Sequence, residues 1–174
     1  LRGLEALAVG GDPAIVLIHD AARPWASPDL VKRVAKAARE RGAALPLLPS
    51  RDTLKEADPS GMVAAHLKRG RVMAAQTPQG FDFWRILRAH RAAEEAIAAG
   101  EADDSFTDDA EVWAAFGEGA VAWVEGEESN LKLHVAAQHA SQEGGQFRRA
   151  HRHAHVAVAR DKGRRVAAIG LVLR

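Results

Sequence analysis

Residues 14–24 read Ala-Ile-Val-Leu-Ile-His-Asp-Ala-Ala-Arg-Pro, an apolar run followed at once by an acid and a base. A short continuous apolar run is typical of a strand buried on both faces, as in a parallel sheet. Open α/β sheets bind ligands just beyond the carboxyl ends of their strands. Asp20 and Arg23 fall at that place, where a carboxylate can hold a metal ion and a guanidinium can bind phosphate. This stretch therefore predicts an α/β fold with a ligand site at its carboxyl end.

The composition suits one domain with a substantial core, because the chain has 174 residues and 47% of them are hydrophobic. The formal net charge is +1 with both signs mixed, which argues against nucleic-acid binding through a broad basic face. The chain has no cysteine, which excludes disulfides and thiolate metal sites and is compatible with a cytoplasmic location. No apolar run reaches about 18 residues, so no membrane span is expected.

Helix and strand signals alternate along the chain. Helices are expected over 1–8, from a Ser27 cap to Gly42, over 82–99 and from a Thr107 cap to Gly117, with strands over 14–18, 43–48 and 120–124. Pro46 and Pro49 argue against a central position for the second strand. A strand, loop and helix within about 30 residues is half of a βαβ unit.

The middle of the chain contains a predicted hairpin arm. Residues 62–67 and 72–75 can pair as short strands across 68–71, which would make a protruding arm. Residues 76–81 are expected to form a loop, because a proline and a glycine interrupt them.

Five separated motifs agree in order and spacing with one protein family. They are His19-Asp20-Ala21-Ala22-Arg23-Pro24, Asp52-Thr53-Leu54-Lys55, Arg69 eight residues before Thr77 in Gln76-Thr77-Pro78-Gln79, Thr107-Asp108-Asp109-Ala110, and Asn130-Leu131-Lys132. Together they resemble 2-C-methyl-D-erythritol 4-phosphate cytidylyltransferase, over residues 1–133. The resemblance implies transfer of CMP from CTP to that polyol phosphate, with release of pyrophosphate and the help of Mg²⁺. It also implies a Rossmann-like, glycosyltransferase-A-like three-layer fold with a mostly parallel sheet.

The resemblance implies roles for particular side chains: substrate contacts for Asp20, Arg23, Thr53, Thr77 and Thr107, cofactor contacts for Asp20 and Ala21, and catalytic contacts for Arg69 and Lys132. Asp20 would hold Mg²⁺, or another divalent cation, and the polyol. Arg23 would support the phosphate site or brace its own loop. Lys132 would hold phosphate oxygens at the reacting centre, and Arg69 would orient the acceptor phosphate.

Each of these side chains also has an ordinary structural interpretation. Asp20 is otherwise a loop or helix-capping acid, and Lys132 a solvated charge at a strand end. Arg69 lies in a run of basic residues, and a charge run is usually a solvated face. Asp108 and Asp109 look like an acid–base pair, but acids are common in the first turn of a helix.

The family's arm implies a homodimer. Thr53 and Arg69 would reach from an arm near residues 53–75 into the partner subunit's site. Asp52 and Lys55 would shape the base of the arm rather than touch substrate.

The chain departs from the family pattern at its start. The family's first strand and its glycine-rich nucleotide loop lie upstream of the segment that begins at Leu1, so further sequence is expected there. Residues 1–174 alone are therefore expected neither to bind CTP tightly nor to turn over, which isothermal titration would test.

The second departure follows Leu133, where residues 134–174 form a basic, histidine-rich tail. A frameshift or a chimera would explain the change, and some relatives continue into a cyclodiphosphate synthase domain. Alternating His151, His153 and His155 suggest zinc binding, whereas the simpler interpretation is a disordered tail.

Two alternatives to the leading function remain open. One is a cytidylyltransferase for another polyol phosphate, such as ribitol 5-phosphate. The other is a non-catalytic remnant that only dimerises.

Overall fold

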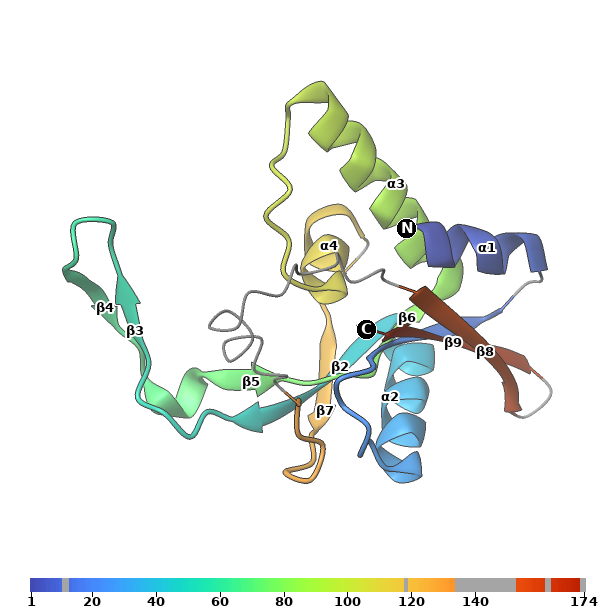
Figure 1. The fold of residues 1–174 in the computed structure, drawn as a ribbon, viewed down its shortest axis with the longest axis horizontal. Coiled ribbons are helices and arrows are strands. Elements are labelled where there is room, and N and C mark those ends of the chain that lie inside the picture. Colours follow the sequence, from blue (N-terminus) through green and yellow to red (C-terminus); the bar gives the residue numbers. More distant parts are fainter. Residues whose placement is uncertain (11–12, 118, 134–152, 162–163, 173–174) are drawn as a thin grey trace, which may run out of the picture.

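The computed structural model describes residues 1–10, 13–117, 119–133, 153–161 and 164–172 (Figure 1). A mixed sheet forms the centre of the molecule, and a two-stranded arm projects away from it. The elements are α1 (Arg2–Gly10), β1 (Ile15–Asp20), α2 (Pro28–Arg41), β2 (Ala43–Pro49), β3 (Lys55–Ala57), β4 (Val63–His66), the 3₁₀ turn η1 (Arg69–Arg71), β5 (Met73–Ala75), β6 (Gln79–Asp82), α3 (Phe83–Ala99), α4 (Asp109–Phe116), β7 (Ala122–Glu125), β8 (His153–Asp161) and β9 (Arg164–Val172). Among the residues described, no helix is long and apolar enough to cross a membrane.

The strands of the main sheet run in the order β5-β2-β6-β1-β9-β8, with β7 also paired to β2. β1 is antiparallel to β6 and parallel to β9, and β2 is antiparallel to β5 and β6 but parallel to β7. The α/β class is confirmed, but the expectation of a mostly parallel sheet is wrong. The chain returns from β2 to β6 through the arm without a crossover helix, and such a return produces antiparallel pairing.

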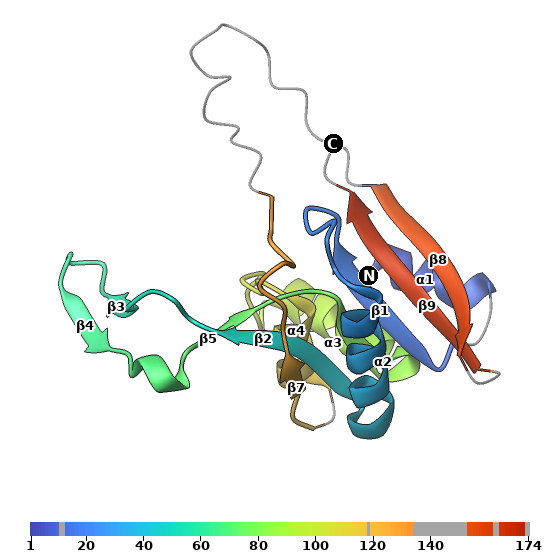
Figure 2. The same cartoon turned by 90° about the horizontal axis from the view of Figure 1, so that it is seen from below.

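β1 is buried on both faces, as its sequence predicts. Val16 packs into one core with α1, α3 and α4, while Ile15 and Leu17 pack into a second core with α2. Helices therefore cover both faces of the sheet, and Figure 2 shows the resulting three layers from below. The strand continues through His19 to Asp20, so the polar motif begins inside the sheet.

Local capping signals explain where the long helices begin and end. Ser27 caps α2 by accepting a hydrogen bond from the Leu30 amide at 3.0 Å. Thr107, expected to cap α4, does not do so. Asp108 is the cap, because its carboxylate accepts from the Glu111 amide at 2.9 Å, while Glu111 in turn accepts from the Thr107 amide at 2.7 Å. This reciprocal arrangement satisfies two amides at the start of the helix.

The predicted loop over residues 76–81 is wrong, because Gln79–Asp82 form β6 between β2 and β1. Pro78 lies just before the strand and therefore removes no ladder donor. Gly80 lies where α2 crosses the sheet, in a space that leaves no room for a side chain. A Cβ there would lie 3.0 Å from atoms of Leu17, Val34 and Ala38.

Gly80→Ala is expected to lower the free energy of unfolding by about 1–3 kcal/mol, because the added methyl group overpacks the contact between sheet and helix. Urea denaturation measures the change. Gly70→Ala is the matched control, since a Cβ at that position meets no atom within 4 Å. Equal stability of the two variants would contradict the packing argument.

β2 is a central strand despite its prolines. Its pairing with β6 ends at Ala44 and its pairing with β5 begins at Leu47. Pro46 falls between these two partners, and its carbonyl still accepts from the Gln76 amide at 2.9 Å. The missing N–H of Pro46 therefore interrupts neither of these two ladders, although Pro46 lies opposite Val124 of β7 and Pro49 lies opposite Met73 of β5.

The protruding arm exists, but its expected pairing is wrong. β4 pairs with β3, and β5 returns to pair with β2. The hairpin turn lies at Asp58, whose carboxylate accepts from the amides of Ser60 at 2.9 Å and Met62 at 3.0 Å. Gly61 supplies a positive φ of 85° in this turn, a conformation that glycine adopts without steric cost.

Within the tail, β8 and β9 form an antiparallel hairpin, and β9 lies parallel to β1. The valine and isoleucine residues of these two strands suit extended backbone. His134, His139 and His151 lie outside the described residues, as does the zinc site that needs His151.

Candidate active site

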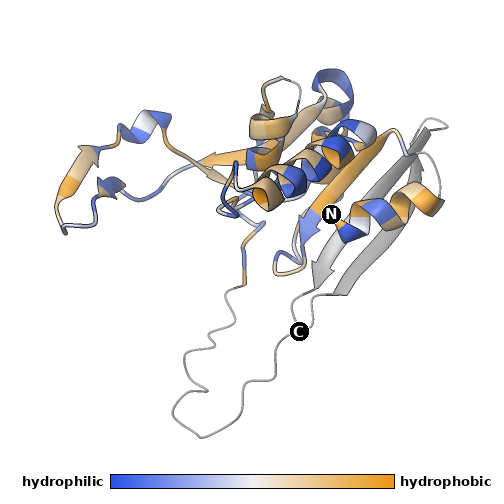
Figure 3. Ribbon diagram, turned by 90° about the horizontal axis from the view of Figure 1, so that it is seen from above, coloured by the Kyte–Doolittle hydropathy of each residue, from blue (hydrophilic) through white to orange (hydrophobic). Residues whose placement is uncertain are grey.

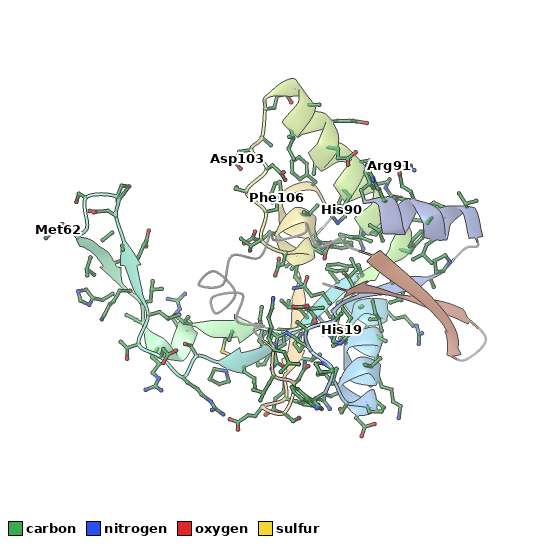
Figure 4. The ribbon with its side chains drawn as sticks, in the orientation of Figure 1. His19, Met62, His90, Arg91, Asp103 and Phe106 are labelled. Atoms are coloured by element: carbon green, nitrogen blue, oxygen red, sulfur yellow. The ribbon has the colours of Figure 1, made fainter. Side chains whose placement is uncertain are left out.

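A cavity of about 680 Å³ opens at the carboxyl end of β1. Its walls come from β1, the start of β6, the helices α1 and α3, the loop before α4 and the loop after β7. Figure 4 labels three of the lining side chains, His19, His90 and Phe106. Five predicted residues from four separate motifs line it: Asp20, Arg23, Thr77, Thr107 and Lys132. Ala21 lies in the turn next to Asp20 but does not line the cavity.

Asp20 and Lys132 form an ion pair at the centre of this set. Lys132 Nζ lies 2.8 Å from Asp20 Oδ2, and the Ala22 amide donates to Asp20 Oδ1 at 3.0 Å. Burial favours the neutral acid, but the hydrogen bond and charge of Lys132, the Ala22 amide and the Arg23 charge together hold the pKa of Asp20 below its ordinary value. Asp20 therefore stays ionised beside the cation.

Asp20→Asn is expected to reveal a pH-dependent part of the stability. The pKa of Asp20 is lower in the folded state than in the unfolded state. The ionised carboxylate therefore stabilises the fold above the unfolded carboxyl pKa of about 3.9, and this stabilisation is lost as the pH falls through the pKa of the folded state. The difference in unfolding free energy between wild type and variant should thus shrink on acidification. Urea titrations at several pH values measure it, and a constant difference would exclude the linkage.

His19 orders the hydroxyl group of Thr77. The Arg23 carbonyl lies 3.0 Å from His19 Nε2 and can only accept, so Nε2 carries a proton. Burial lowers the pKa of His19, although the Arg23 carbonyl and the Asp20 charge act in the opposite direction. The ring is therefore neutral, and its Nδ1 accepts a hydrogen bond from the Thr77 hydroxyl group at 2.9 Å. Thr77 Oγ1 in turn accepts from the Asp20 amide at 3.0 Å. Sequence analysis assigned His19 no role, although it lies in the motif.

Arg23 is held by backbone carbonyls in this structure. Its guanidinium donates to Asn130 at 2.8 Å and to Ala75 at 3.4 Å. The contacts connect the turn after β1 to the loop after β7. They correspond to the second of the two roles that the sequence left open for Arg23, bracing of its own loop rather than phosphate binding.

The acid pair at the start of α4 has structural partners. Gln79, only 3% exposed, donates to Asp108 at 2.8 Å and accepts from the Ala110 amide at 3.1 Å. His90 Nε2 lies 2.9 Å from Asp109 Oδ1. These contacts fix the helix start against β6 and α3, and sequence reasoning had missed both Gln79 and His90.

The two remaining site residues lie on the arm and do not line the cavity. Thr53 is exposed, and Arg69 donates to the backbone carbonyls of Ser50 at 3.4 Å and Arg51 at 2.5 Å. The structure of one chain therefore does not bring them to Asp20 and Lys132. The expectation that they act in a partner subunit stays a prediction.

The donor set fits a magnesium ion that is held largely by phosphates and water. In the described ranges, no three histidines, aspartates or glutamates gather into a metal site. Mg²⁺ usually takes only one or two carboxylates from the protein and completes its shell with water and substrate phosphates. Asp20, half-buried and ionised at the cavity, meets that requirement.

Comparisons with known proteins agree with the motifs. The sequence model of a family described as IspD, 2-C-methyl-D-erythritol 4-phosphate cytidylyltransferase, matches residues 1–144. The chain is 48% identical over 133 residues to proteins named bifunctional enzyme IspD/IspF from Nitrobacter hamburgensis and Rhodopseudomonas palustris strain HaA2. Each match covers 75% of this chain and 31% of the relative, so the chain spans about a third of the length of these relatives.

Solved structures give the same fold. The 2-C-methyl-D-erythritol 4-phosphate cytidylyltransferase of Thermus thermophilus superposes with a TM-score of 0.61 at 37% identity, covering 76% of this chain and 60% of that one. The 4-diphosphocytidyl-2C-methyl-D-erythritol synthase of Anaerococcus prevotii superposes with a TM-score of 0.64 at 33% identity, covering 76% and 55%. The Rossmann-like nucleotidyltransferase fold expected from the motifs is thereby confirmed.

Proposed function

The chain belongs to the 2-C-methyl-D-erythritol 4-phosphate cytidylyltransferase family, and we propose that residues 1–133 form the acceptor side of its active site. The reaction transfers CMP from CTP to 2-C-methyl-D-erythritol 4-phosphate and gives 4-diphosphocytidyl-2-C-methyl-D-erythritol and pyrophosphate. One observation carries the proposal: side chains from four separate motifs line a single cavity, with the ion pair of Asp20 and Lys132 at its centre.

The chemistry requires two anions to meet. An oxygen of the acceptor phosphate attacks the α-phosphorus of CTP, a new P–O bond forms, and the bond to the β-phosphate breaks with its electron pair leaving on pyrophosphate. Such a reaction depends on alignment and charge neutralisation more than on proton transfer. Lys132 supplies positive charge at the cavity, and Thr77 and Thr107 supply hydroxyl groups for orientation.

We further propose that Asp20 holds Mg²⁺, or another divalent cation, with Ala21 beside it in the cofactor contact. The ion would supply charge neutralisation on the phosphates. The depressed pKa of Asp20 supports this role, because a metal ligand must be ionised.

The arm supports a homodimer in which Thr53 and Arg69 act on the partner subunit's substrate. Four large apolar side chains along the arm are exposed: Leu54, Met62, Val63 and Leu67. The hydropathy colouring shows apolar positions on this projecting segment (Figure 3), and Figure 4 shows Met62 near its end. Exposed apolar groups of this kind commonly mark a protein–protein contact.

Met62→Asp is expected to weaken the dimer, because a charge would be placed in an apolar contact. Analytical ultracentrifugation of residues 1–174 measures the association constant. Val9→Asp is the control, since Val9 is 92% exposed on α1, away from the arm. Equal effects of the two substitutions would argue against the arm as the interface.

The transfer reaction is tested by joining residues 1–174 to the nucleotide-binding segment that precedes the matched residues in the Nitrobacter hamburgensis relative. Release of pyrophosphate from CTP that depends on 2-C-methyl-D-erythritol 4-phosphate would support the proposal. Faster release with ribitol 5-phosphate would identify the alternative acceptor. A folded joined protein that is inactive with both acceptors would leave the non-catalytic remnant as the explanation.

A further inference from the structure

Lys132 is carried by a loop without regular structure, and two buried amide side chains fix that loop to the end of the sheet. The loop runs over residues 126–133, after β7. Gln76 is 6% exposed and Asn130 is fully buried. The sequence motifs contain both residues but assign neither of them a role.

The side chain of Gln76 bonds to the loop as another peptide unit would. Its Oε1 accepts from the Glu127 amide at 3.0 Å, and its Nε2 donates to the Glu127 carbonyl at 2.9 Å. The same Nε2 lies 3.3 Å from the Asn130 carbonyl. A primary amide offers a donor and an acceptor together, so it can satisfy both groups of one residue, whereas an ionised carboxylate can only accept.

Asn130 completes the attachment from the loop side. Its Nδ2 donates to the Thr77 carbonyl at 2.8 Å, and its own carbonyl accepts from Arg23 at 2.8 Å. Next to Lys132, the Leu133 amide donates to the Ala22 carbonyl at 2.7 Å. These contacts lie on both sides of Lys132 and connect it to the segments that carry Thr77 and Asp20.

The loop packs so closely on Gln76 that its first residue has no space for a side chain. A Cβ at Gly126 would lie 2.6 Å from Gln76 Oε1 and 3.2 Å from the Leu47 carbonyl. Glu127 adds a third attachment, because its carboxylate accepts from Ser27 at 2.7 Å and from Arg33 at 2.9 Å. The loop is therefore held by polar contacts as well as by close packing against the end of β2, where Leu48 Cγ would lie 3.1 Å from the same Cβ.

We propose that Gln76 and Asn130 are positioning residues that place the Lys132 ammonium group at Asp20, and so at the acceptor phosphate of the proposed reaction. The inference deepens the proposed function and rests on it for the identity of that phosphate. The two amides carry no charge, so they order the loop without competing with the phosphate for Lys132. Buried polar networks can specify one arrangement of a site, and the Gln76 and Asn130 amide groups here make four hydrogen bonds across the loop boundary, although Asn130 Oδ1 has no partner among the described residues.

The test uses residues 1–174 with ¹⁵N labelling and the substitution Gln76→Met, which keeps the length of the side chain and removes its hydrogen bonds. Two quantities are measured by NMR: the order of the Lys132 ammonium group and the hydrogen exchange of the Leu133 amide. In Gln76→Met the ammonium order parameter should fall to about half, and the Leu133 amide should exchange about tenfold faster.

Asp82→Ala is the matched control, because it removes the cap of α3 and a comparable amount of stability without touching the loop. In Asp82→Ala the order parameter of the Lys132 ammonium group should stay at the wild-type value. The Leu133 amide should exchange no faster than the lower global stability of the variant explains. A wild-type ammonium order in Gln76→Met, or an equal loss in Asp82→Ala, would overturn the inference.

Gly126→Ala provides a second variant should Gln76→Met not fold, because its methyl group displaces Gln76 Oε1 while the glutamine remains. It should produce the same loss of order at Lys132, and an undisturbed Lys132 would again count against the inference. Neither readout requires turnover. An inactive joined protein whose loop responds as described would therefore overturn the proposed reaction and leave the positioning role supported.

Discussion

Lys132→Met should lower the rate of cytidylyl transfer by the joined protein about 10²–10³-fold, the effect typical of removing one preorganised group that stabilises charge in the transition state. Lys132 lines the cavity and lies 2.8 Å from Asp20, so its loss removes a positive charge at the proposed phosphate site. Methionine keeps most of the length of the side chain. The effect should therefore appear in kcat more than in the stability of the fold.

Steady-state release of pyrophosphate measures this change, with urea denaturation as the check on folding. Lys36→Met is the control, because Lys36 is exposed on α2, where its ammonium group lies 4.0 Å from the Glu40 carboxylate. Lys132→Arg should recover part of the rate, since it restores the charge with a different geometry. A Lys132→Met rate within threefold of wild type would remove Lys132 from the reaction.

Trp113→Ala is expected to have the largest effect on stability, a loss of about 3–5 kcal/mol in the free energy of unfolding, because it leaves a cavity in the core. Trp113 heads the fully buried side chains by volume among the residues described. Its ring lies 5.8 Å from that of Phe81, the Arg85 guanidinium lies 4.7 Å above it, and its indole N–H donates to Gly119 at 3.1 Å.

Thermal or urea unfolding measures the loss, and Trp123→Ala is the matched control. Trp123 is 60% exposed on β7, so its truncation should cost about 1 kcal/mol or less. Similar losses of unfolding free energy in the two variants would mean that Trp113 of α4 is not buried in the core. Because α4 also carries Asp108 and Asp109 into the cavity wall, unfolding of this region would disturb the site as well.

Local signals in the sequence determined the elements that depend on neighbouring residues. The apolar run before His19 identified β1, the serine before Pro28 identified the start of α2, and Gly100 marked the end of α3. Four of the five motifs also predicted side chains that share a cavity, because strand ends and loops of an α/β sheet converge at one edge.

The tertiary structure alone decided features that depend on residues distant in the chain. The sequence placed Gly80 in a loop, because it does not show that α2 packs over this residue. Pro46 argued against a central position for β2, because the sequence does not show which residues pair on either side of it. The role of Gln76 could not be predicted from the sequence for the same reason, because its hydrogen-bond partners lie 51 and 54 residues away along the chain. Spacing along a chain reports capping and periodicity, whereas close packing and buried hydrogen bonds exist only after the sheet has brought those distant segments together.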